Sequence, residues 1–275
     1  MTYVEKKPIN RSTLRLFLGQ TYYRIKKYCH WWFSGNYYSK EISKVKLEYL
    51  ISTHNTPLFR KLKNVDMNLQ SNKVENLKLA LKNLNGITIM PNEYFSYWKL
   101  IGKPTYKKGY KDGLILCPNG DFKPGIAGGL CQLSNLIYWM TLHTPLTVTE
   151  RYRHSHDVFP DVNRTQPFGS GATCHFNYLD LEIKNTTNSP YQLNLYLTTD
   201  KLIGEWRSTE ICNYKYKIYE KDHSITPGFF GHYIRNNTIY RKVFNLEGSE
   251  IKDEYISENH AFMMYQPYIS NEGNI

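Results

Sequence analysis

The fold is decided by residues 125–161, which read GIAGGLCQLSNLIYWMTLHTPLTVTERYRHSHDVFPD. After three glycines, apolar residues recur at the spacing of one helix face, namely Leu130, Leu133, Ile137 and Met140. Glycine lets the backbone take a positive φ or approach another group closely, as a tight turn before a helix requires. The pattern predicts a helix that begins near Cys131 and ends before Pro145, because the residue preceding a proline avoids the α region.

Cys131 is the residue of this stretch that carries chemistry. In the first turn of a helix, unpaired backbone N–H groups and the positive end of the helix dipole lower the pKa of a thiol. The β-branched residues 147–149 then predict a strand that leads to His154 and His156. On a strand these two histidines would share one face, because side chains alternate with a period of two.

A cysteine nucleophile is the most specific hypothesis. The chain order of Cys131, then His154 or His156, then Asp180 is that of transglutaminase-like and papain-like amide enzymes. We expect the histidine, with a slight preference for His154, to take the thiol proton and return it to the leaving amine, while Asp180 orients the imidazole. The Gln132 side chain or the backbone N–H of Cys131 would stabilise the oxyanion.

Two other interpretations stay open. Cys131 fits equally well as a small buried apolar residue, with both histidines hydrogen-bonded to backbone inside a sheet. A zinc ion could instead be held by a wider set, Cys131, His154, His156, Cys174 and His175. Their spacing is unlike that of a compact zinc module, so we expect neither a metal nor a cofactor.

A length of 275 residues suffices for one large domain with a smaller appendage. We expect a basic, aromatic helical segment at 1–50 and the main domain at 51–275. Five irregularly spaced cysteines do not suggest a disulfide framework, so reduced thiols on the cytosolic side are the simpler interpretation. No export signal or membrane-spanning run is evident, which predicts a cytoplasmic location or one on the inner face of the cell membrane.

The positive charge is concentrated near the N-terminus. The chain has a net charge of +11, and residues 1–46 hold ten lysines and arginines against two glutamates, so eight of these charges lie there. An anionic partner such as a lipid surface or a wall polymer suits this distribution, whereas no specific nucleic-acid module is recognisable. Residues 12–33 mix apolar, aromatic and basic side chains, so they either contact a membrane peripherally or pack on the main domain. No oligomeric state is predicted.

Helix and strand patterns fill the rest of the chain. Residues 72–84 predict a helix and 41–51 a shorter one, whereas 87–90 and 114–117 predict strands. The alternation of 174–184 predicts a strand that carries Asp180, and four further strands follow, with a hairpin turn at Asn236-Asn237. The expected fold is α+β, with a helical N-terminal half packed on a C-terminal antiparallel β-sheet, in a transglutaminase-like or papain-like arrangement.

Several short motifs occur in a characteristic order. They are Asn85-Gly86, Tyr94-Phe95-Ser96, Ile101-Gly102, Gly109-Tyr110, Gly128-Gly129-Leu130-Cys131-Gln132-Leu133-Ser134, Glu150-Arg151, His154-Ser155 and Asp180-Leu181 with Lys184-Asn185. With these motifs the chain resembles the VanW family, with a shared core at roughly residues 72–200. The resemblance implies a role near glycopeptide resistance at the cell envelope, without a settled activity. We also expect Gly128, Gly129, Gln132, Ser134 and Arg151 to contribute to binding.

Two functional classes remain. In the first, the protein is a cysteine-dependent peptidase or transamidase that acts on a cell-wall peptide or its precursor. In the second, it is a non-catalytic accessory module that binds an anionic envelope component or a partner protein. Replacement of Cys131 by alanine distinguishes them, since only the first class requires the sulfur.

Overall fold

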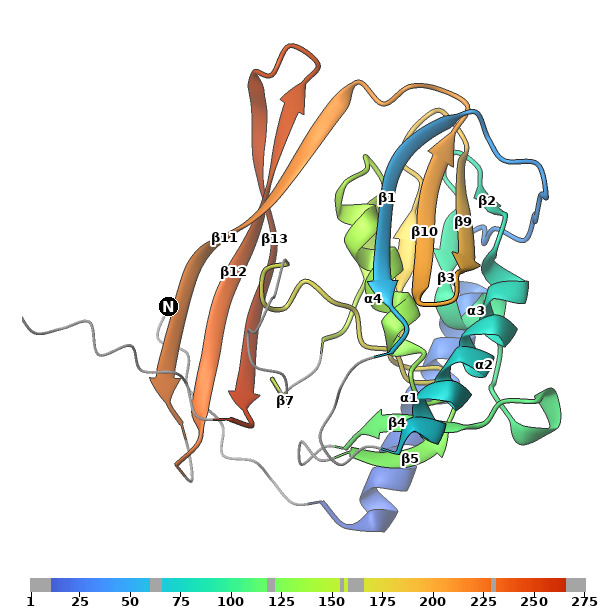
Figure 1. The fold of residues 1–275 in the computed structure, drawn as a ribbon, viewed down its shortest axis with the longest axis vertical. Coiled ribbons are helices and arrows are strands. Elements are labelled where there is room, and N and C mark those ends of the chain that lie inside the picture. The colour runs from blue at the N-terminus through green and yellow to red at the C-terminus, as the bar shows by residue number, and fades with distance from the viewer. Residues whose placement is uncertain are drawn as a thin grey trace, which may run out of the picture.

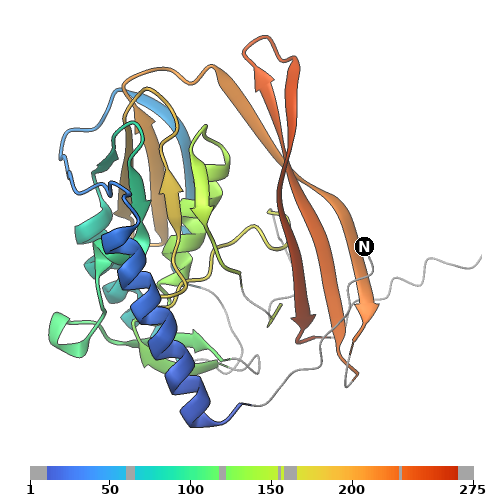
Figure 2. The ribbon, with the colours of Figure 1, turned by 180° about the vertical axis from the view of Figure 1, so that it is seen from behind.

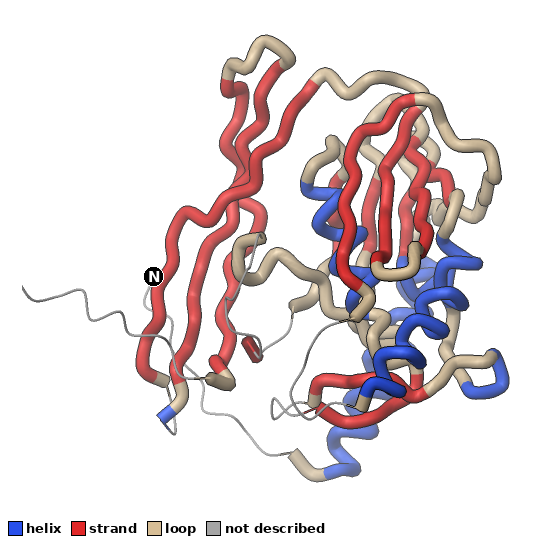
Figure 3. Tube along the Cα trace, viewed as in Figure 1, coloured by secondary structure: helices blue, strands red, loops and turns tan. Residues whose placement is uncertain are grey.

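The computed structural model describes residues 11–59, 66–117, 122–153, 156–157, 166–228 and 231–265. The fold is α+β (Figures 1 and 3). The helices and three sheets lie within residues 11–208 and form what we call the body, and a long antiparallel sheet formed mainly by residues 214–263 stands beside it. The helices are α1 (Thr13–Phe33), α2 (Met67–Leu84), α3 (Tyr97–Ile101), the 3-10 turn η1 (Tyr106–Lys108) and α4 (Cys131–Leu142). The strands are β1 (Tyr49–Pro57), β2 (Ile87–Ile89), β3 (Tyr94–Ser96), β4 (Asp112–Leu116), β5 (Phe122–Ile126), β6 (Thr147–Glu150), β7 (His156–Asp157), β8 (Glu182–Lys184), β9 (Tyr191–Leu197), β10 (Lys201–Ser208), β11 (Tyr214–Pro227), β12 (Tyr233–Asn245) and β13 (Glu250–Met263).

The body is built on a four-stranded antiparallel sheet with the order β1-β10-β9-β2. Helix α4 packs on β1 and β10, and α2 packs on β9. The fully buried Trp206 of β10 donates a hydrogen bond from Nε1 to Thr141 Oγ1 of α4 at 3.1 Å. Because β1 pairs along its length with β10, the sheet joins both halves of the chain. The domain boundary predicted at residue 50 falls inside β1.

Smaller units complete the body. Strands β3, β8 and β6 form an antiparallel sheet, and β4 pairs with β5 as a hairpin. Helix α2 begins earlier than its apolar pattern predicts, because the Asp66 side chain accepts a hydrogen bond from Asn68 N and caps the helix at Met67. The strands predicted at 87–90, 114–117 and 147–149 correspond to β2, β4 and β6.

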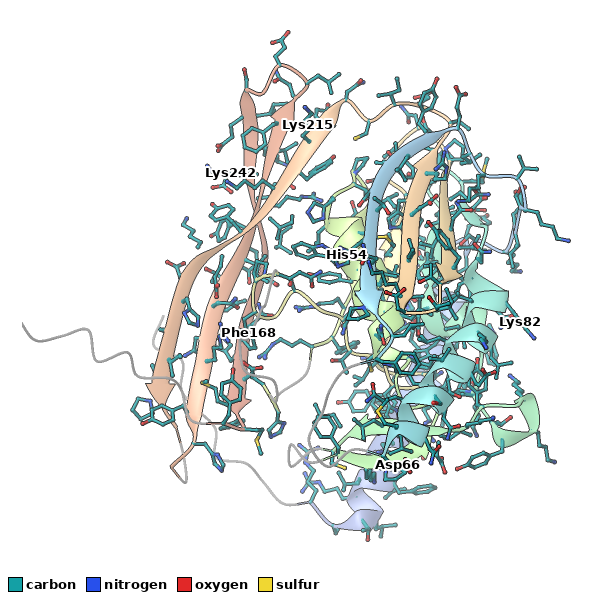
Figure 4. All side chains as sticks on the ribbon, in the orientation of Figure 1. His54, Asp66, Lys82, Phe168, Lys215 and Lys242 are labelled. Atoms are coloured by element: carbon teal, nitrogen blue, oxygen red, sulfur yellow. The ribbon has the colours of Figure 1, made fainter. Side chains whose placement is uncertain are left out.

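A second sheet, β11-β12-β13-β7, stands beside the body, on the left in Figure 1. Figure 4 shows Phe168 between this sheet and the body, where its carbonyl accepts a hydrogen bond from Asn237 Nδ2 at 2.7 Å. Arg241 of β12 donates to the carbonyls of Leu142 and Thr144 at 3.2 and 3.0 Å. A cation at the C-terminal end of α4 also suits the helix dipole. These contacts dock the second sheet against the Cys131-bearing helix.

Three local predictions are wrong. Asn236 and Asn237 form no turn but lie inside β12, where the buried Asn237 amide is satisfied by Phe168 and Glu220. Residues 41–51 form no helix, because the buried Gln192 side chain bonds the backbone of Leu47 and Val45 instead.

Only 182–184 of the strand predicted at 174–184 is a strand. Before it, His175 and Leu179 exchange backbone hydrogen bonds at 2.9 and 3.0 Å across a tight loop. The alternation is misleading here, because Asn177 and Asp180 occupy polar positions and yet are completely buried. Asp180 therefore lies in a loop, just before β8.

Helix α1 lies along the outside of the body, in front of it in Figure 2. One face is docked, since Lys27 and Trp31 are buried and Lys99 Nζ donates to the Trp31 carbonyl at 3.0 Å. The remaining apolar side chains of α1 are largely exposed. None of the helices in the described residues is both long and apolar enough to cross a membrane.

Candidate functional site

The turn before α4 places Cys131 at the first position of the helix, as the sequence predicts. Gly129 has φ of 94°, which an L side chain rarely adopts. A Cβ on Gly128 would lie 2.2 Å from the carbonyl carbon of Gly113, so only glycine lets this turn approach β4 so closely. The close turn leaves the Cys131 side chain half-buried at the edge of the body.

Cys174 faces Cys131 across the site. The two Sγ atoms are 3.6 Å apart, and Cys131 Sγ is 3.5 Å from the Cys174 carbonyl oxygen. Burial raises the pKa of the Cys174 thiol far above its usual range, and the contact with Cys131 raises it further. Cys174 therefore keeps its proton, and its S–H can donate to a Cys131 thiolate. The Cys131 S–H in turn donates to the Cys174 carbonyl, a contact that only the neutral thiol can make.

Buried polar contacts hold the Cys174 segment against the first turn of α4. Ser134 Oγ donates to the Ala172 carbonyl at 2.6 Å, and Asn135 Oδ1 accepts from Ala172 N at 2.7 Å. The hydroxyl of the fully buried Tyr97 donates to the Leu130 carbonyl at 3.0 Å. Burial, followed by the nearby thiols, raises the pKa of Tyr97, so it remains a neutral donor.

Gln132 and Arg151, like Ser134, are predicted to bind a ligand but are engaged within the protein. Both donated hydrogen bonds of the Gln132 amide go to β1, to Thr56 Oγ1 at 2.8 Å and to the Pro57 carbonyl at 2.9 Å. Arg151 bonds the carbonyls of Gly169 and Gly171, and its guanidinium lies 5.0 Å from the Tyr138 ring centroid. The N–H groups of the Gln132 amide, predicted as an oxyanion donor, are therefore already used within the protein.

The histidines considered as a catalytic base or as zinc ligands lie in different parts of the protein. His154 lies outside the described residues. His156 belongs to β7, which pairs with β13, and its ring lies 5.9 Å from the Phe262 ring. His175 directly follows Cys174 and is exposed at the surface. Desolvation lowers the pKa of His175, although its contact with the Phe176 carbonyl at 3.3 Å opposes the shift.

Asp180 is part of a buried ion cluster around Lys27. The ammonium nitrogen of Lys27 lies 2.6 Å from Glu150 Oε2, 2.9 Å from Glu182 Oε1 and 3.1 Å from Asp180 Oδ2. Asp180 also accepts hydrogen bonds from Ser96 Oγ at 2.6 Å and from the backbone N–H of residue 98 at 2.9 Å. This cluster ties α1 to β6 and β8.

Comparison with known proteins identifies the family. A family model described as VanW like protein matches residues 72–207. The chain is 37% identical over 213 residues to the vancomycin B-type resistance protein VanW of Enterococcus faecalis. The aligned residues are 78% of this chain and 77% of that protein. The chain belongs to the VanW family.

The chain is also similar to the uncharacterized protein YoaR of Bacillus subtilis, with 28% identity over 152 residues, which are 55% of this chain and 48% of that protein. No solved structure matches this VanW-family chain. The predicted transglutaminase-like or papain-like architecture is therefore unsupported.

The described part of the VanW-family chain contains no group of three or more histidine, cysteine, aspartate or glutamate side chains arranged to hold a metal ion. Of the ligands considered for zinc, Cys131, Cys174 and His175 lie in one region, whereas His154 lies outside the described residues. In the ion cluster, the Lys27 ammonium occupies the position between carboxylates that a cation would take.

Sequence reasoning missed the pairing of Cys131 with Cys174 and the role of Lys27 in this VanW-family chain. Cys131 and Cys174 are 43 positions apart, and Lys27 and Glu182 are 155 apart. No periodicity or motif spacing reports contacts over such separations. The only available signal was that Cys174 precedes a histidine, which suggested a metal ligand instead of a partner for Cys131.

The thiol pair predicts a specific cross-link. Diamide treatment of a variant with Cys29, Cys117 and Cys212 replaced by serine should join Cys131 to Cys174, because 3.6 Å needs only a small closure to reach a bond of about 2.0 Å. Mass spectrometry should show a monomer that has lost two hydrogen atoms. Additional replacement of Cys174 by serine should abolish this product, and persistence of both thiols in the oxidised parent would contradict the geometry.

Asp180 predicts a pH dependence of stability. Burial raises its pKa to about 6, although Lys27 and Ser96 oppose the shift. The folded protein thus binds a proton more tightly than the unfolded chain, whose aspartates have a pKa of about 3.9. The resulting stabilisation is fully present below the unfolded pKa and is lost as the pH rises through about 6.

Urea unfolding of the wild type and Asp180→Asn at pH 4, 5, 6 and 7 measures this effect. The free energy of unfolding of the wild type should fall relative to that of the variant over this range, because asparagine does not titrate. A difference that stays constant with pH would show that Asp180 does not titrate in this window.

Proposed function

We propose that this VanW-family protein is an accessory protein of glycopeptide resistance at the cell envelope, in which Cys131 attacks an amide bond of a cell-wall peptide or its precursor. The resistance role is inferred from the name of the Enterococcus relative. The chemistry rests on one observation, the half-buried thiol at the start of α4 with a second thiol 3.6 Å away. We further propose the cytoplasmic face of the membrane as its location, because free cysteines suit a reducing compartment.

The proposed reaction begins with the thiolate of Cys131. It forms when the thiol proton passes to an imidazole, and the helix dipole and the S–H of Cys174 stabilise the negative sulfur. The sulfur attacks the amide carbonyl carbon, the negative charge moves to the carbonyl oxygen, and the backbone N–H of Cys131 donates to that oxygen. When the C–N bond breaks, an imidazole gives the nitrogen a proton and the amine leaves. Water then hydrolyses the thioester, or a second amine attacks it in a transfer reaction.

The imidazole in this scheme comes from His154 or His156, as their order in the chain predicts, or from His175. His175 is favoured because it directly follows Cys174, the partner of Cys131, and because it is exposed to solvent. Asp180 is the predicted acid that orients the imidazole. Its carboxylate already binds Lys27 and Ser96, so the imidazole would have to share the carboxylate with these two partners. The analogy with transglutaminase and papain enzymes is thus one of residue order and chemistry.

A non-catalytic binding module is the second candidate. The observation in its favour is that Gln132 and Arg151, two motif residues, are used for internal contacts. In that case the motif residues around Cys131 would stabilise the shape of a binding surface and would not form a catalytic centre.

The test uses wall stem peptides and the variant in which only Cys131 and Cys174 remain. After incubation, mass spectrometry should detect cleaved or exchanged amides and a thioester adduct on the Cys131 peptide. Iodoacetamide labelling at pH 6.5 should modify Cys131 and stop turnover, because a lowered pKa leaves thiolate well below the free-thiol value of about 8.5. Unchanged peptides, together with no labelling below pH 8, would favour the binding module.

A further inference from the structure

The solvent face of α1 carries an uncovered apolar stripe. Leu14, Leu18, Tyr22, Ile25 and Trp32 follow one another at spacings of four, four, three and seven residues, which places them on one side of a helix. Their exposed fractions lie between 57% and 68%. Globular helices normally turn such a stripe toward the core. The sequence conceals this face, because the helix also carries apolar residues on the side that docks.

The opposite face holds α1 to the body. Lys27 binds three carboxylates there, Trp31 is buried, and Asn177 Nδ2 donates to the Arg24 carbonyl at 3.3 Å. The helix therefore cannot turn its stripe inward without breaking this cluster. In Figure 2 the helix runs along the outside of the body.

Charge identifies what the stripe fits. Helix α1 contains no aspartate or glutamate, and exposed Arg11, Arg15 and Lys26 flank the stripe. An open groove along its first half is lined by Arg11 and Arg15 together with Leu14 and Leu18. Basic side chains beside apolar ones match the phosphate and acyl regions of an anionic lipid surface.

Aromatic residues at the other end support the same partner. Trp32, Phe33 and Tyr37 are strongly exposed, and aromatic side chains of this kind favour the level of lipid headgroups. A second copy of the chain fits poorly, because face-to-face pairing would bring the same arginines and lysine of each copy together.

We propose that α1 lies in the plane of an anionic membrane surface, with Leu14, Leu18, Tyr22, Ile25 and Trp32 inserted and Arg11, Arg15 and Lys26 on headgroup phosphates. The Lys27 cluster then couples the body rigidly to that surface. This inference does not depend on the chemistry of Cys131, so Cys131→Ala should bind vesicles as the wild type does.

Co-sedimentation of the full chain with vesicles of phosphatidylglycerol and phosphatidylcholine tests the proposal. The triple variant Leu14→Glu, Leu18→Glu, Ile25→Glu should lower the partition coefficient at least about 100-fold. The matched control replaces Ile211, Leu246 and Ile251 by glutamate. These residues are equally exposed but belong to the second sheet region, so the same charge change should cost less than about fivefold. Pure phosphatidylcholine vesicles should bind at least about tenfold more weakly than the mixture.

A measurement on the unaltered stripe guards against unfolding of the variant. Brominated lipid should quench part of the tryptophan fluorescence of the wild type, and Trp32→Phe should remove that part. The proposal is overturned if the wild type does not sediment with anionic vesicles, or if the stripe and control variants bind alike. It is also overturned if light scattering shows a dimer of the wild type that the stripe variant disperses, because the stripe would then be a self-association surface.

Discussion

Lys27→Met is expected to lower the free energy of unfolding at pH 7 by about 3–5 kcal/mol. The wild-type ammonium is 6% exposed and lies within 3.1 Å of an oxygen of each of three carboxylates. Methionine fills a similar volume but leaves Asp180 and Glu182 buried without their counter-charge. An uncompensated buried charge is far more costly than the loss of an exposed ion pair. Urea unfolding followed by tryptophan fluorescence measures the change.

Lys78→Met provides the matched control. Lys78 pairs with Glu75 at 2.7 Å on the surface of α2, with 55% of its side chain exposed, so its loss should cost about 0.5 kcal/mol or less. Part of the Lys27→Met deficit should be recovered at pH 5, because loss of the Lys27 charge raises the pKa of Asp180 above its wild-type value of about 6 and the variant therefore gains more from protonation. Equal unfolding midpoints for the two variants would mean that the cluster does not hold α1 to the body.

Cys131→Ala is expected to reduce turnover of the cell-wall amide at least about 1,000-fold, because the nucleophilic sulfur is removed and the remaining thiol, Cys174, is buried and stays protonated. Stability should change by about 1 kcal/mol or less, since the side chain is only half-buried. Cys174→Ser should lower the rate less, because its S–H only supports the Cys131 thiolate, and it should raise the pH at which iodoacetamide labels Cys131. Amine release and the urea midpoint, measured on the same samples, separate catalysis from folding.

Cys117→Ser is the control for cysteine loss in general, because Cys117 is likewise half-buried but follows β4 and is not part of the motif. It should retain wild-type turnover. If the Cys131→Ala variant keeps its activity while its fold is intact, the Cys131 sulfur is not the nucleophile. That result would favour the non-catalytic binding module. If Cys174→Ser alone abolishes turnover, the buried thiol has more than a supporting role.

Local patterns were sufficient for part of this fold. The helix that starts at Cys131, the glycine turn before it and the strands near Ile87, Leu114 and Thr147 follow from periodicity and backbone restrictions. Such features depend on neighbours within a few residues, where steric and hydrogen-bonding preferences act directly. The motif around Cys131 was also sufficient to indicate the family.

Patterns failed where buried polar groups replaced regular structure. The alternation around Asp180 predicts a strand, yet its carboxylate is held in a loop by Lys27 and Ser96. Asn237 resembles a turn residue, yet its amide is satisfied inside β12 by Phe168 and Glu220. In both cases the partner comes from another part of the chain, which propensity does not register.

The sequence by itself determined the α+β class, the position of Cys131 at a helix start, the basic N-terminal charge and the family. Only the tertiary structure decided that Cys174 faces Cys131, that Lys27 gathers three carboxylates and that one apolar face of α1 stays in solvent. The physical reason is the separation along the sequence between the residues that interact. Helix starts and turns are set by adjacent residues, whereas a thiol pair, an ion cluster and an uncovered face depend on which distant segments the core brings together.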